Sequence, residues 1–339
     1  MRVFLLTIAA FLCCFAFSHT GNATEHQDKK LIAFSSDATD NDKQQIFIMD
    51  ENGDGVKQVC HKNLNCISPR FSPDGRKIVF VGTNVVSDFI YMVDLDDTSS
   101  FRMPKFIDGG SDPQFSPDGK YLLYRSEKNL DNNVYIIDLT NDSIRIVSDG
   151  SLSTYAKFSP DGKKVLYSSS AYGNFDLVLM DLHDTSEDAQ LTIAETQDAE
   201  LYGTFSSDGK WISYSSFDIK YKGTLHVCNS DGSNNKTVSK GLSTAYNPKF
   251  SPDGSMLAFV GGSGDLDVYI CSADGSGLKQ LTSKSGNTLE FDWSGDGKKI
   301  VYEKIKEGVS SVNIINLETG KSEDLTGEKA NNINPNFQK

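Results

Sequence analysis

Apolar residues along this chain form short runs, separated by turns rich in Pro, Asp, Gly and Ser. Such runs, four to eight residues long and rich in β-branched and aromatic side chains, predict β-strands. The segment Phe-Ser-Pro-Asp-Gly at 71–75 precedes one of them. Pro presets φ, Asp bonds nearby backbone and Gly supplies the left-handed conformation, so this segment predicts a tight turn between two strands.

Copies of this turn return at a regular spacing. Their aspartates are Asp74, Asp118, Asp161, Asp208, Asp253 and Asp296, which gives steps of 44, 43, 47, 45 and 43 residues. A period of roughly 40–50 residues is typical of repeat architectures. We therefore expect a series of like units in one long all-β domain.

Each unit reads as four strands. The expected first strands end at Phe71, Phe115, Phe158, Phe205, Phe250, Trp293 and Phe337. The second strands begin near Leu31, Ile78, Leu122, Val165, Ile212, Leu257 and Ile300. The third strands are 46–50, 90–94, 134–138, 177–181, 225–229, 268–272 and 312–316. The fourth strands are centred on Val59, Phe106, Ile146, Leu191, Val238, Leu281 and Leu325.

The first unit lacks its first strand, and the last strand, ending at Phe337, lacks its unit. A ring explains both ends, because four-stranded sheets arranged radially leave only short edges. The sequence therefore predicts a seven-bladed β-propeller in which residues 333–337 lie innermost in the blade of residues 30–60. Six blades is the alternative if one weak unit is miscounted.

The repeated Phe-Ser-Pro-Asp-Gly, together with Gly173-Asn174-Phe175-Asp176 and Leu278 to Thr282, resembles the TolB-like, WD-like β-propeller repeat. The resemblance covers about residues 30–339 and implies the propeller fold, but it does not specify a function. The family includes periplasmic TolB, sugar-acid lyases such as oligogalacturonate lyases, and propeller domains of peptidases. TolB carries an α/β domain before its propeller, for which we expect no room here, so the resemblance leaves a role in a Tol-like envelope assembly in doubt.

The chain is acidic, with a formal net charge of −13. An acidic surface without a Lys/Arg stripe is a poor partner for nucleic acid or for an anionic membrane. We therefore expect neither as a partner.

Residues 1–18 begin with one positive charge and continue as an apolar run, the pattern of a secretory signal peptide. Cleavage after Ser18 or Ala23 would leave a lead-in at 24–29, a propeller at 30–339 and no membrane span in the mature chain. We expect export to the periplasm or the extracellular space. An uncleaved anchor and, from Cys13 and Cys14, a lipoprotein are the alternatives.

Four further cysteines follow the leader. Cys60 and Cys66 are close in the sequence of a chain that we expect to be exported, which favours a local disulfide without fixing its connectivity. Cys228 and Cys271 occupy equivalent repeat positions and are expected to be buried free thiols.

The sequence offers weak metal signals. His26, His61, His183 and His226 occupy different repeat positions, which argues against one histidine cluster. Asp50, Asn52, Asp54 and Gly55 match the opening of a calcium loop, but the twelfth position is His61 rather than Glu, so a plain hairpin is the better explanation. We expect no cofactor, with Ca²⁺ as the alternative.

Binding in repeat scaffolds usually uses the longer, more varied loops. In this chain those are the second-to-third and fourth-to-first loops, which lie on one face of a propeller. Three residues before the end of each first strand, seven side chains are expected to ring the channel on that face, and we call them the mouth ring: Ser68, Asp112, Tyr155, Tyr202, Asn247, Glu290 and Asn334. We expect Tyr246 and Glu200 to lie beside them.

The mouth ring supports two interpretations. It lines a wet funnel, or it binds a peptide segment, sugar or small ligand, with tyrosines stacking and Asp112 and Glu290 orienting it. The sequence favours a non-catalytic module that binds a protein, a small molecule or a glycan. The alternatives are a glycan-active lyase or hydrolase and a subunit of an envelope assembly.

Overall fold

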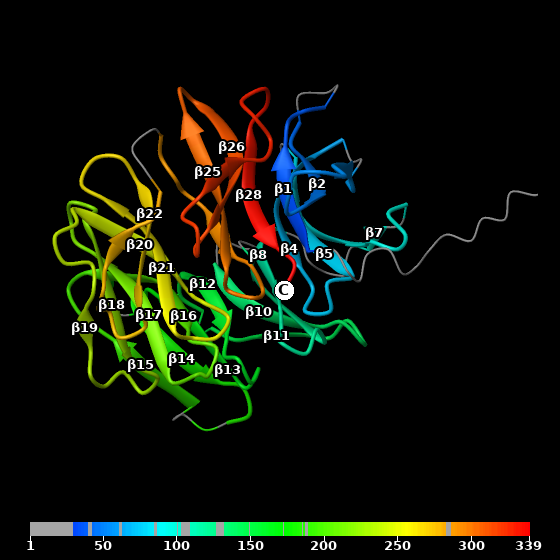
Figure 1. The fold of residues 1–339 in the computed structure, drawn as a ribbon. Helices are drawn as coiled ribbons and strands as arrows, with labels where there is room; N and C mark the ends of the chain where they lie inside the picture. Colours follow the sequence, from blue (N-terminus) through cyan, green and yellow to red (C-terminus); the bar gives the residue numbers. More distant parts are fainter. Residues whose placement is uncertain are drawn as a thin grey trace, which may run out of the picture.

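The computed structural model describes residues 30–39, 43–60, 63–84, 87–99, 101–102, 109–126, 132–148, 150–171, 173–184, 186, 189–282 and 286–339. These residues form seven four-stranded antiparallel sheets, the blades of a propeller (Figure 1). The seven-bladed all-β prediction is therefore confirmed. Within this described part, we find no helix with the length and hydropathy that crossing a bilayer requires.

The strands of each blade are given from the channel outward. Blade 1 contains β28 (Asn332–Phe337), β1 (Leu31–Ser36), β2 (Gln45–Asp50) and β3 (Lys57–Gln58). Blade 2 contains β4 (Asn65–Phe71), β5 (Lys77–Thr83), β6 (Asp88–Asp94) and β7 (Phe101–Arg102). Blade 3 contains β8 (Gly110–Phe115), β9 (Tyr121–Ser126), β10 (Asn133–Asp138) and β11 (Ile144–Ile146). Blade 4 contains β12 (Ser153–Phe158), β13 (Lys164–Ser169), β14 (Asp176–Asp181) and β15 (Gln190–Ala194).

The remaining blades follow the same order. Blade 5 contains β16 (Ala199–Phe205), β17 (Trp211–Phe217), β18 (Gly223–Asn229) and β19 (Lys236–Thr237). Blade 6 contains β20 (Thr244–Phe250), β21 (Met256–Gly262), β22 (Asp267–Ser272) and β23 (Lys279–Gln280). Blade 7 contains β24 (Phe291–Trp293), β25 (Lys299–Lys306), β26 (Val309–Asn316) and β27 (Ser322–Asp324).

All seven innermost strands end at the aromatic residue that the sequence indicated. Four of the outermost strands, β3, β19, β23 and β27, differ from the prediction because each ends one residue before the expected apolar centre. Val59 and Val238, for example, follow β3 and β19 and are buried. The apolar residue that the sequence indicated is thus the one that packs into the core directly after the outermost strand ends. In blade 2 the strand is Phe101–Arg102, and Phe106 lies outside the described residues.

The blades are joined by seven clusters of buried side chains, each containing residues from two neighbouring blades. The cluster between blades 7 and 1 contains Val301 and Ile314 together with Phe34 and Phe337. Seven interfaces for seven blades mean that the described residues close a complete ring. Apolar burial between the blades provides the main driving force for this closure.

The Ser-Pro-Asp-Gly turns contain a hydrogen-bond network in which the serine has a role that the sequence pattern did not reveal. In blade 2 the Ser72 hydroxyl donates to Asp74 at 2.5 Å and accepts the backbone N–H of Lys77 at 2.9 Å. Asp74 also accepts the N–H of Arg76 at 3.1 Å. The same arrangement recurs at Ser116, Ser159, Ser206, Ser251 and Ser294. Each turn thus satisfies its backbone donors without help from another blade.

Strand β28 completes blade 1 by pairing antiparallel with β1, from Ile32 opposite Phe337 to Ser36 opposite Asn332 (Figure 1). The prediction that the carboxy-terminal strand closes the ring is confirmed. The next residue, Gln338, donates from its side chain to the carbonyl of Gly75 in blade 2 at 2.9 Å. Gly75 has a φ of +69°, so its backbone conformation favours glycine, and a Cβ there would also displace the Gln338 side chain, whose Nε2 would lie 2.3 Å away.

Cys60 and Cys66 are buried between blades 1 and 2, and their Sγ atoms lie 2.7 Å apart. In an oxidising compartment we expect a disulfide between them, since two sulfur atoms at this separation need to move only slightly to form a covalent bond. Mass spectrometry of the unreduced protein should then show one linked peptide pair. The Cys60→Ser/Cys66→Ser protein should lose about 2 kcal/mol of stability, the chain-entropy value for so short a loop. Two alkylated thiols in protein taken from its native compartment would contradict this expectation.

Cys228 and Cys271 are buried free thiols, as predicted. Burial raises the pKa of each to about 12, so both stay protonated and unreactive at neutral pH.

Candidate functional site

The innermost strands surround a cavity of ≈ 580 Å³ along the axis of the ring. Of the predicted mouth residues, six line it: Ser68, Asp112, Tyr155, Tyr202, Asn247 and Glu290. Asn334 is not part of this lining, and its backbone N–H donates to the Glu303 carboxylate at 3.3 Å. Tyr246 also lies outside the lining and packs against Tyr202. The repeat position therefore brings most of the predicted side chains together in one cavity.

A β-bulge accompanies the mouth ring in six of the seven blades. Between Leu201 and Thr204, for example, β16 has one residue more than its partner β17. The bulged mouth residue is left-handed in each case, with φ of 51° to 60°: Ser68, Asp112, Tyr155, Tyr202, Asn247 and Asn334. Non-glycine residues rarely adopt this conformation, which costs roughly 1–2 kcal/mol. Because the same bulge recurs in six blades, including at Asn334 outside the cavity lining, it is a feature of the repeat that holds the mouth residues in a fixed backbone conformation.

One side of the mouth is aromatic. The Tyr155 and Tyr202 ring centroids lie 4.0 Å apart, and the Tyr155 hydroxyl donates to that of Tyr202 at 3.1 Å. Tyr246 and Phe217 lie 5.8 and 6.1 Å from the Tyr202 ring. We call these four residues the tyrosine shelf. Burial raises the pKa of Tyr246 to about 12 and that of Tyr202 further, so both remain neutral and offer ring faces and hydroxyls.

The blades on either side of Tyr155 and Tyr202 carry polar mouth residues. The Glu290 carboxylate accepts the Asn247 amide at 3.3 Å and lies 3.6 Å from the Lys249 ammonium. Asp112 lies 3.9 Å from the Arg125 guanidinium. An aromatic shelf flanked by fixed polar and charged groups is the usual composition of a site for an amphipathic ligand.

A second ring of polar side chains lies two residues further along each innermost strand and also lines the cavity. We call it the inner ring, and its members are Arg70, Gln114, Lys157, Thr204, Lys249, Asp292 and Asn336. The sequence analysis missed it, although all seven positions that precede the terminal aromatic residue are polar. That regularity was the available signal.

Asp292 fastens the closing strand to blade 7. Its carboxylate accepts the Asn336 side chain at 2.9 Å, the Phe337 N–H at 3.1 Å and the Lys339 ammonium at 3.0 Å. Burial opposes ionisation of Asp292, but Lys339 and Lys249 outweigh it and hold the carboxyl pKa below its ordinary value. This member of the inner ring is therefore an ionised structural anchor.

Glu200 is not beside the mouth, contrary to expectation. It is fully buried, accepts the Thr196 hydroxyl at 2.6 Å and takes no part in lining the cavity. Its side chain lies on the same face of blade 5 as Ile212 and Tyr214, which pack on blade 4. The alternation of strand side chains decided this, because residue 200 precedes the bulge that turns Tyr202 inward.

The metal signals find no common site. His183 is exposed, whereas His226 stacks on Tyr214 at 5.0 Å and contacts Ser216, and neither lines the cavity. His26 and His61 lie outside the described residues. Asp50 accepts the N–H groups of Asn52 and Asp54, both at 3.0 Å, as in an ordinary hairpin turn. Among the described residues, no group of three His, Cys, Asp or Glu side chains is placed to hold a metal ion.

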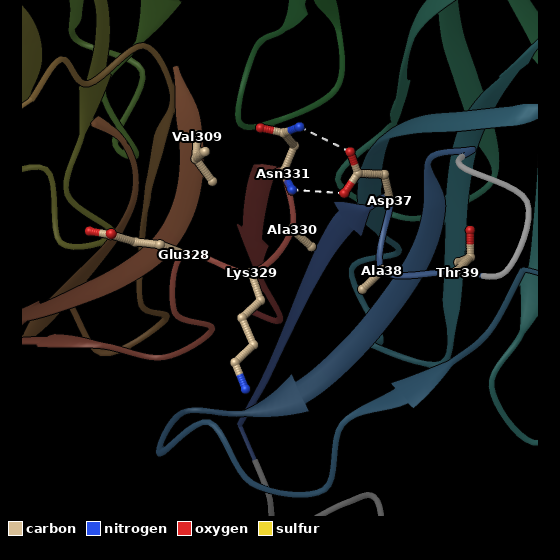
Figure 2. Close-up of a pocket in the computed structure, with 8 residues that line it drawn as sticks. All are labelled: Asp37, Ala38, Thr39, Val309, Glu328, Lys329, Ala330 and Asn331. Carbon is tan, nitrogen blue, oxygen red and sulfur yellow. Dashed lines mark hydrogen bonds between the residues drawn. The ribbon is translucent and has the colours of Figure 1, made fainter. Parts of the chain in front are cut away.

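A second cavity, of ≈ 500 Å³, lies on the loop-bearing face where blades 7 and 1 meet (Figure 2). Asp37 accepts the Asn331 backbone N–H at 2.7 Å and its side-chain amide at 3.0 Å, as Figure 2 shows. Both carboxylate oxygens are thus used to join the loop after β1 to the segment before β28. This cavity follows from ring closure, and we assign the candidate ligand site to the axial channel.

Comparison with solved structures gives the same fold in proteins of different activities. TolB from Acinetobacter baumannii superposes with a TM-score of 0.62 at 22% identity, over 91% of this chain and 66% of that one. A puromycin-hydrolyzing peptidase from Mycobacterium tuberculosis gives 0.70 at 15% identity, over 88% and 52%. An oligogalacturonate lyase from Vibrio parahaemolyticus gives 0.64 at 15% identity, over 89% and 87%. At these identities the similarity shows the fold alone.

In sequence, the chain is 32% identical over 105 residues to dipeptidyl-peptidase 5 of Porphyromonas endodontalis, a match that spans 29% of this chain and 15% of that protein. The chain thus matches only a small part of that relative and just under two thirds of the Acinetobacter TolB. Residues 26–200 and 184–339 match the family described as TolB beta propeller domain. The protein therefore belongs to the TolB beta-propeller family.

Proposed function

We propose that this protein is an exported, non-catalytic binding module that uses the channel mouth and the loops around it to bind a protein, glycan or small ligand. The observation that carries the proposal is the mixed composition of the mouth: Tyr155 and Tyr202 of the tyrosine shelf line a cavity of ≈ 580 Å³ between Asp112 of blade 3 on one side and Asn247 and Glu290 of blades 6 and 7 on the other. Aromatic faces beside fixed polar groups bind and orient sugars and peptide side chains. The left-handed mouth residues support it, because a rigid, preorganised site loses little entropy on binding.

Substitution in the tyrosine shelf should test this proposal. We expect Tyr202→Ala and Asp112→Ala each to reduce binding of a partner captured from the native compartment about 10-fold or more, because central aromatic and charged residues dominate binding energy. Tyr121→Ala is the matched control, since Tyr121 is an exposed tyrosine of β9 that does not line the cavity. Affinity is measured by calorimetry with the purified partner. Equal affinities for the Tyr202, Asp112 and Tyr121 variants would contradict a binding role for the mouth.

A glycan-active enzyme is the second candidate function. One observation favours it. The structural match to the oligogalacturonate lyase covers 89% of this chain and 87% of the lyase, whereas the match to the peptidase covers 52% of the peptidase. In that case Asp112→Ala and Glu290→Ala would abolish turnover of an oligosaccharide. Such a loss would replace the binding proposal. If the protein is a subunit of a Tol-like assembly, the partner captured from the native compartment should be an envelope protein.

A further inference from the structure

Four cationic and three anionic side chains line the axial channel, although the chain as a whole carries a formal net charge of −13. The cations that line it are Arg70, Lys157, Lys249 and Lys339. The anions are Asp112, Glu290 and Asp292. Because an acidic protein has no general reason to collect cations around its axis, this arrangement requires a local explanation.

The channel carboxylates already have cationic neighbours. Asp292 binds the Lys339 ammonium at 3.0 Å, and Glu290 lies 3.6 Å from Lys249. Asp112 faces Arg125, a residue outside the cavity lining, at 3.9 Å. The negative charges in the channel are thus directed at Lys339, Lys249 and Arg125.

Arg70 and Lys157 are the cavity-lining cations that form no ion pair among the described residues. The Arg70 guanidinium donates from Nη1 to the Pro69 carbonyl at 3.0 Å and forms no ion pair within the described part of the chain. The Lys157 ammonium has neither a hydrogen bond nor an ion pair there. Both side chains line the cavity, where desolvation makes an unpaired charge costly.

We propose that Arg70 and Lys157, assisted by Lys249, bind an oxyanion, a carboxylate or phosphate group, in the middle of the channel. This inference rests on the proposed function and specifies its ligand: the body lies on the tyrosine shelf and the anionic group extends down to the inner ring. A guanidinium with free N–H groups matches the paired oxygens of either anion, and ammonium groups add point charges.

The ionisation of Lys157 agrees with this assignment. Burial lowers its pKa, repulsion by Arg70 and Lys249 lowers it further, and Asp112 and Glu290 oppose the change, so that the pKa lies at about 8. A bound anion would raise this pKa, because it favours the charged form. Affinity should therefore fall as the pH rises through about 8, where the free protein loses the Lys157 proton.

Calorimetric titration of the full-length protein at pH 6.5 with four probes tests the proposal: inorganic phosphate, phenyl phosphate, benzoate and the neutral benzyl alcohol. We expect the anions to bind and benzyl alcohol to bind at least about 10-fold more weakly than benzoate, because hydrogen bonds to charged groups carry that much discrimination. Tighter binding of phenyl phosphate than of benzoate would assign the site to phosphates, and the reverse order to carboxylates. Absence of binding by all three anions would overturn the proposal.

Lys157→Gln and Arg70→Gln should each weaken phosphate binding about 10-fold or more. Lys164→Gln, an exposed lysine of the same blade outside the cavity, is the matched control and should bind like the parent. Removing an unpaired cation relieves repulsion, so the melting temperature of the phosphate-free Lys157→Gln protein should not fall. Unchanged phosphate affinity in a folded Lys157→Gln protein would refute the site.

Comparison of Lys157→Gln with Tyr202→Ala separates this inference from the proposed function. A captured partner that binds through Tyr202 but is insensitive to Lys157→Gln would leave the binding module standing and remove the oxyanion site. If phosphate binding depends on Lys157 but the partner binds equally well to the mouth variants, the oxyanion site stands and the proposed binding role of the mouth fails.

Discussion

Removing residues 332–339 should abolish cooperative folding of the propeller. The deletion takes away β28, the innermost strand of blade 1, and exposes the cluster that joins blades 7 and 1. It also removes the three donors that satisfy the buried Asp292 carboxylate. A ring depends on every interface, so opening one leaves two unpaired edges as well as exposed apolar surface. Thermal unfolding followed by circular dichroism should show a broad, early transition in place of a single one.

A graded version of this experiment uses Phe337→Ala, which leaves the strand in place. Phe337 is 1% exposed, and truncating such a core aromatic residue costs about 3–5 kcal/mol. In a domain of this size that lowers the melting temperature by roughly 10 °C. Val56→Ala is the control, since Val56 lies in the same blade and is 55% exposed. A synthetic peptide of residues 330–339 should restore the transition of the deleted protein. A deletion protein as stable as the parent would show that the strand does not hold the ring closed.

The second large effect is expected at Glu200, a carboxylate with no exposed surface. Burial raises its pKa to about 7, the Thr196 hydroxyl opposes this, and Asp176 and Asp198 raise it further. A folded-state pKa above the unfolded value of 4.5 means that the folded protein holds the proton more tightly. Stability should therefore be greatest below about pH 4.5, decline as the pH rises to about 7, and then stay level. The pKa difference corresponds to a decline on the order of 3 kcal/mol.

Glu200→Gln should remove this decline. At pH 8 we expect the variant to be more stable than the parent, because it buries a neutral amide in place of a charge. At pH 5 the variant should be no more stable than the parent, or less stable. The new amide nitrogen can take the place of Oε2, which has no hydrogen-bond partner among the described residues, and a buried donor without a partner is destabilising. Chemical denaturation between pH 5 and 9 measures the slope, with Glu318→Gln, an exposed glutamate, as the control. A parent protein whose stability does not change between pH 5 and 8 would contradict the assignment.

The repeated turns should lower the stability of the fold at low pH. The Ser116 hydroxyl and the Lys120 N–H lower the pKa of Asp118, and the same kinds of bonds act on Asp161. A lowered carboxyl pKa stabilises the fold above the unfolded value of 3.8 and loses this effect as the pH falls through the folded value. Together with Glu200, the turns place the most stable range between about pH 4 and 5.

The fold could be predicted from the sequence because the same pattern of turn and strand residues recurs in each unit. Each terminal aromatic residue, from Phe71 to Phe337, marked the end of an innermost strand, and the fixed spacing to the next copy gave the blade count. The weak points were the outermost strands, which are short and exposed on one edge and so have little apolar signal of their own. The expected export, with a leader at 1–23, concerns residues that the structure does not describe.

The candidate site was readable only in part. Register alone placed Asp112, Tyr155 and Tyr202 at the cavity, since a position fixed relative to the turn faces the same way in each blade. The same reasoning applied two residues further along would have found Lys157. It failed for Glu200, because a β-bulge changes which side chains face the channel.

By itself, the sequence determined the local structure and the count: seven strand sets, the turns between them, and a final strand without a unit of its own. These follow from turn chemistry and side-chain periodicity, which act over a few residues. Only the tertiary structure decided which polar groups meet. Bulges turned the mouth residues into left-handed positions, ring closure brought Asp292 to Lys339, and convergence of seven strands placed Arg70 near Lys157. Electrostatic interactions of this kind depend on distances through space between distant segments, and no local pattern encodes them.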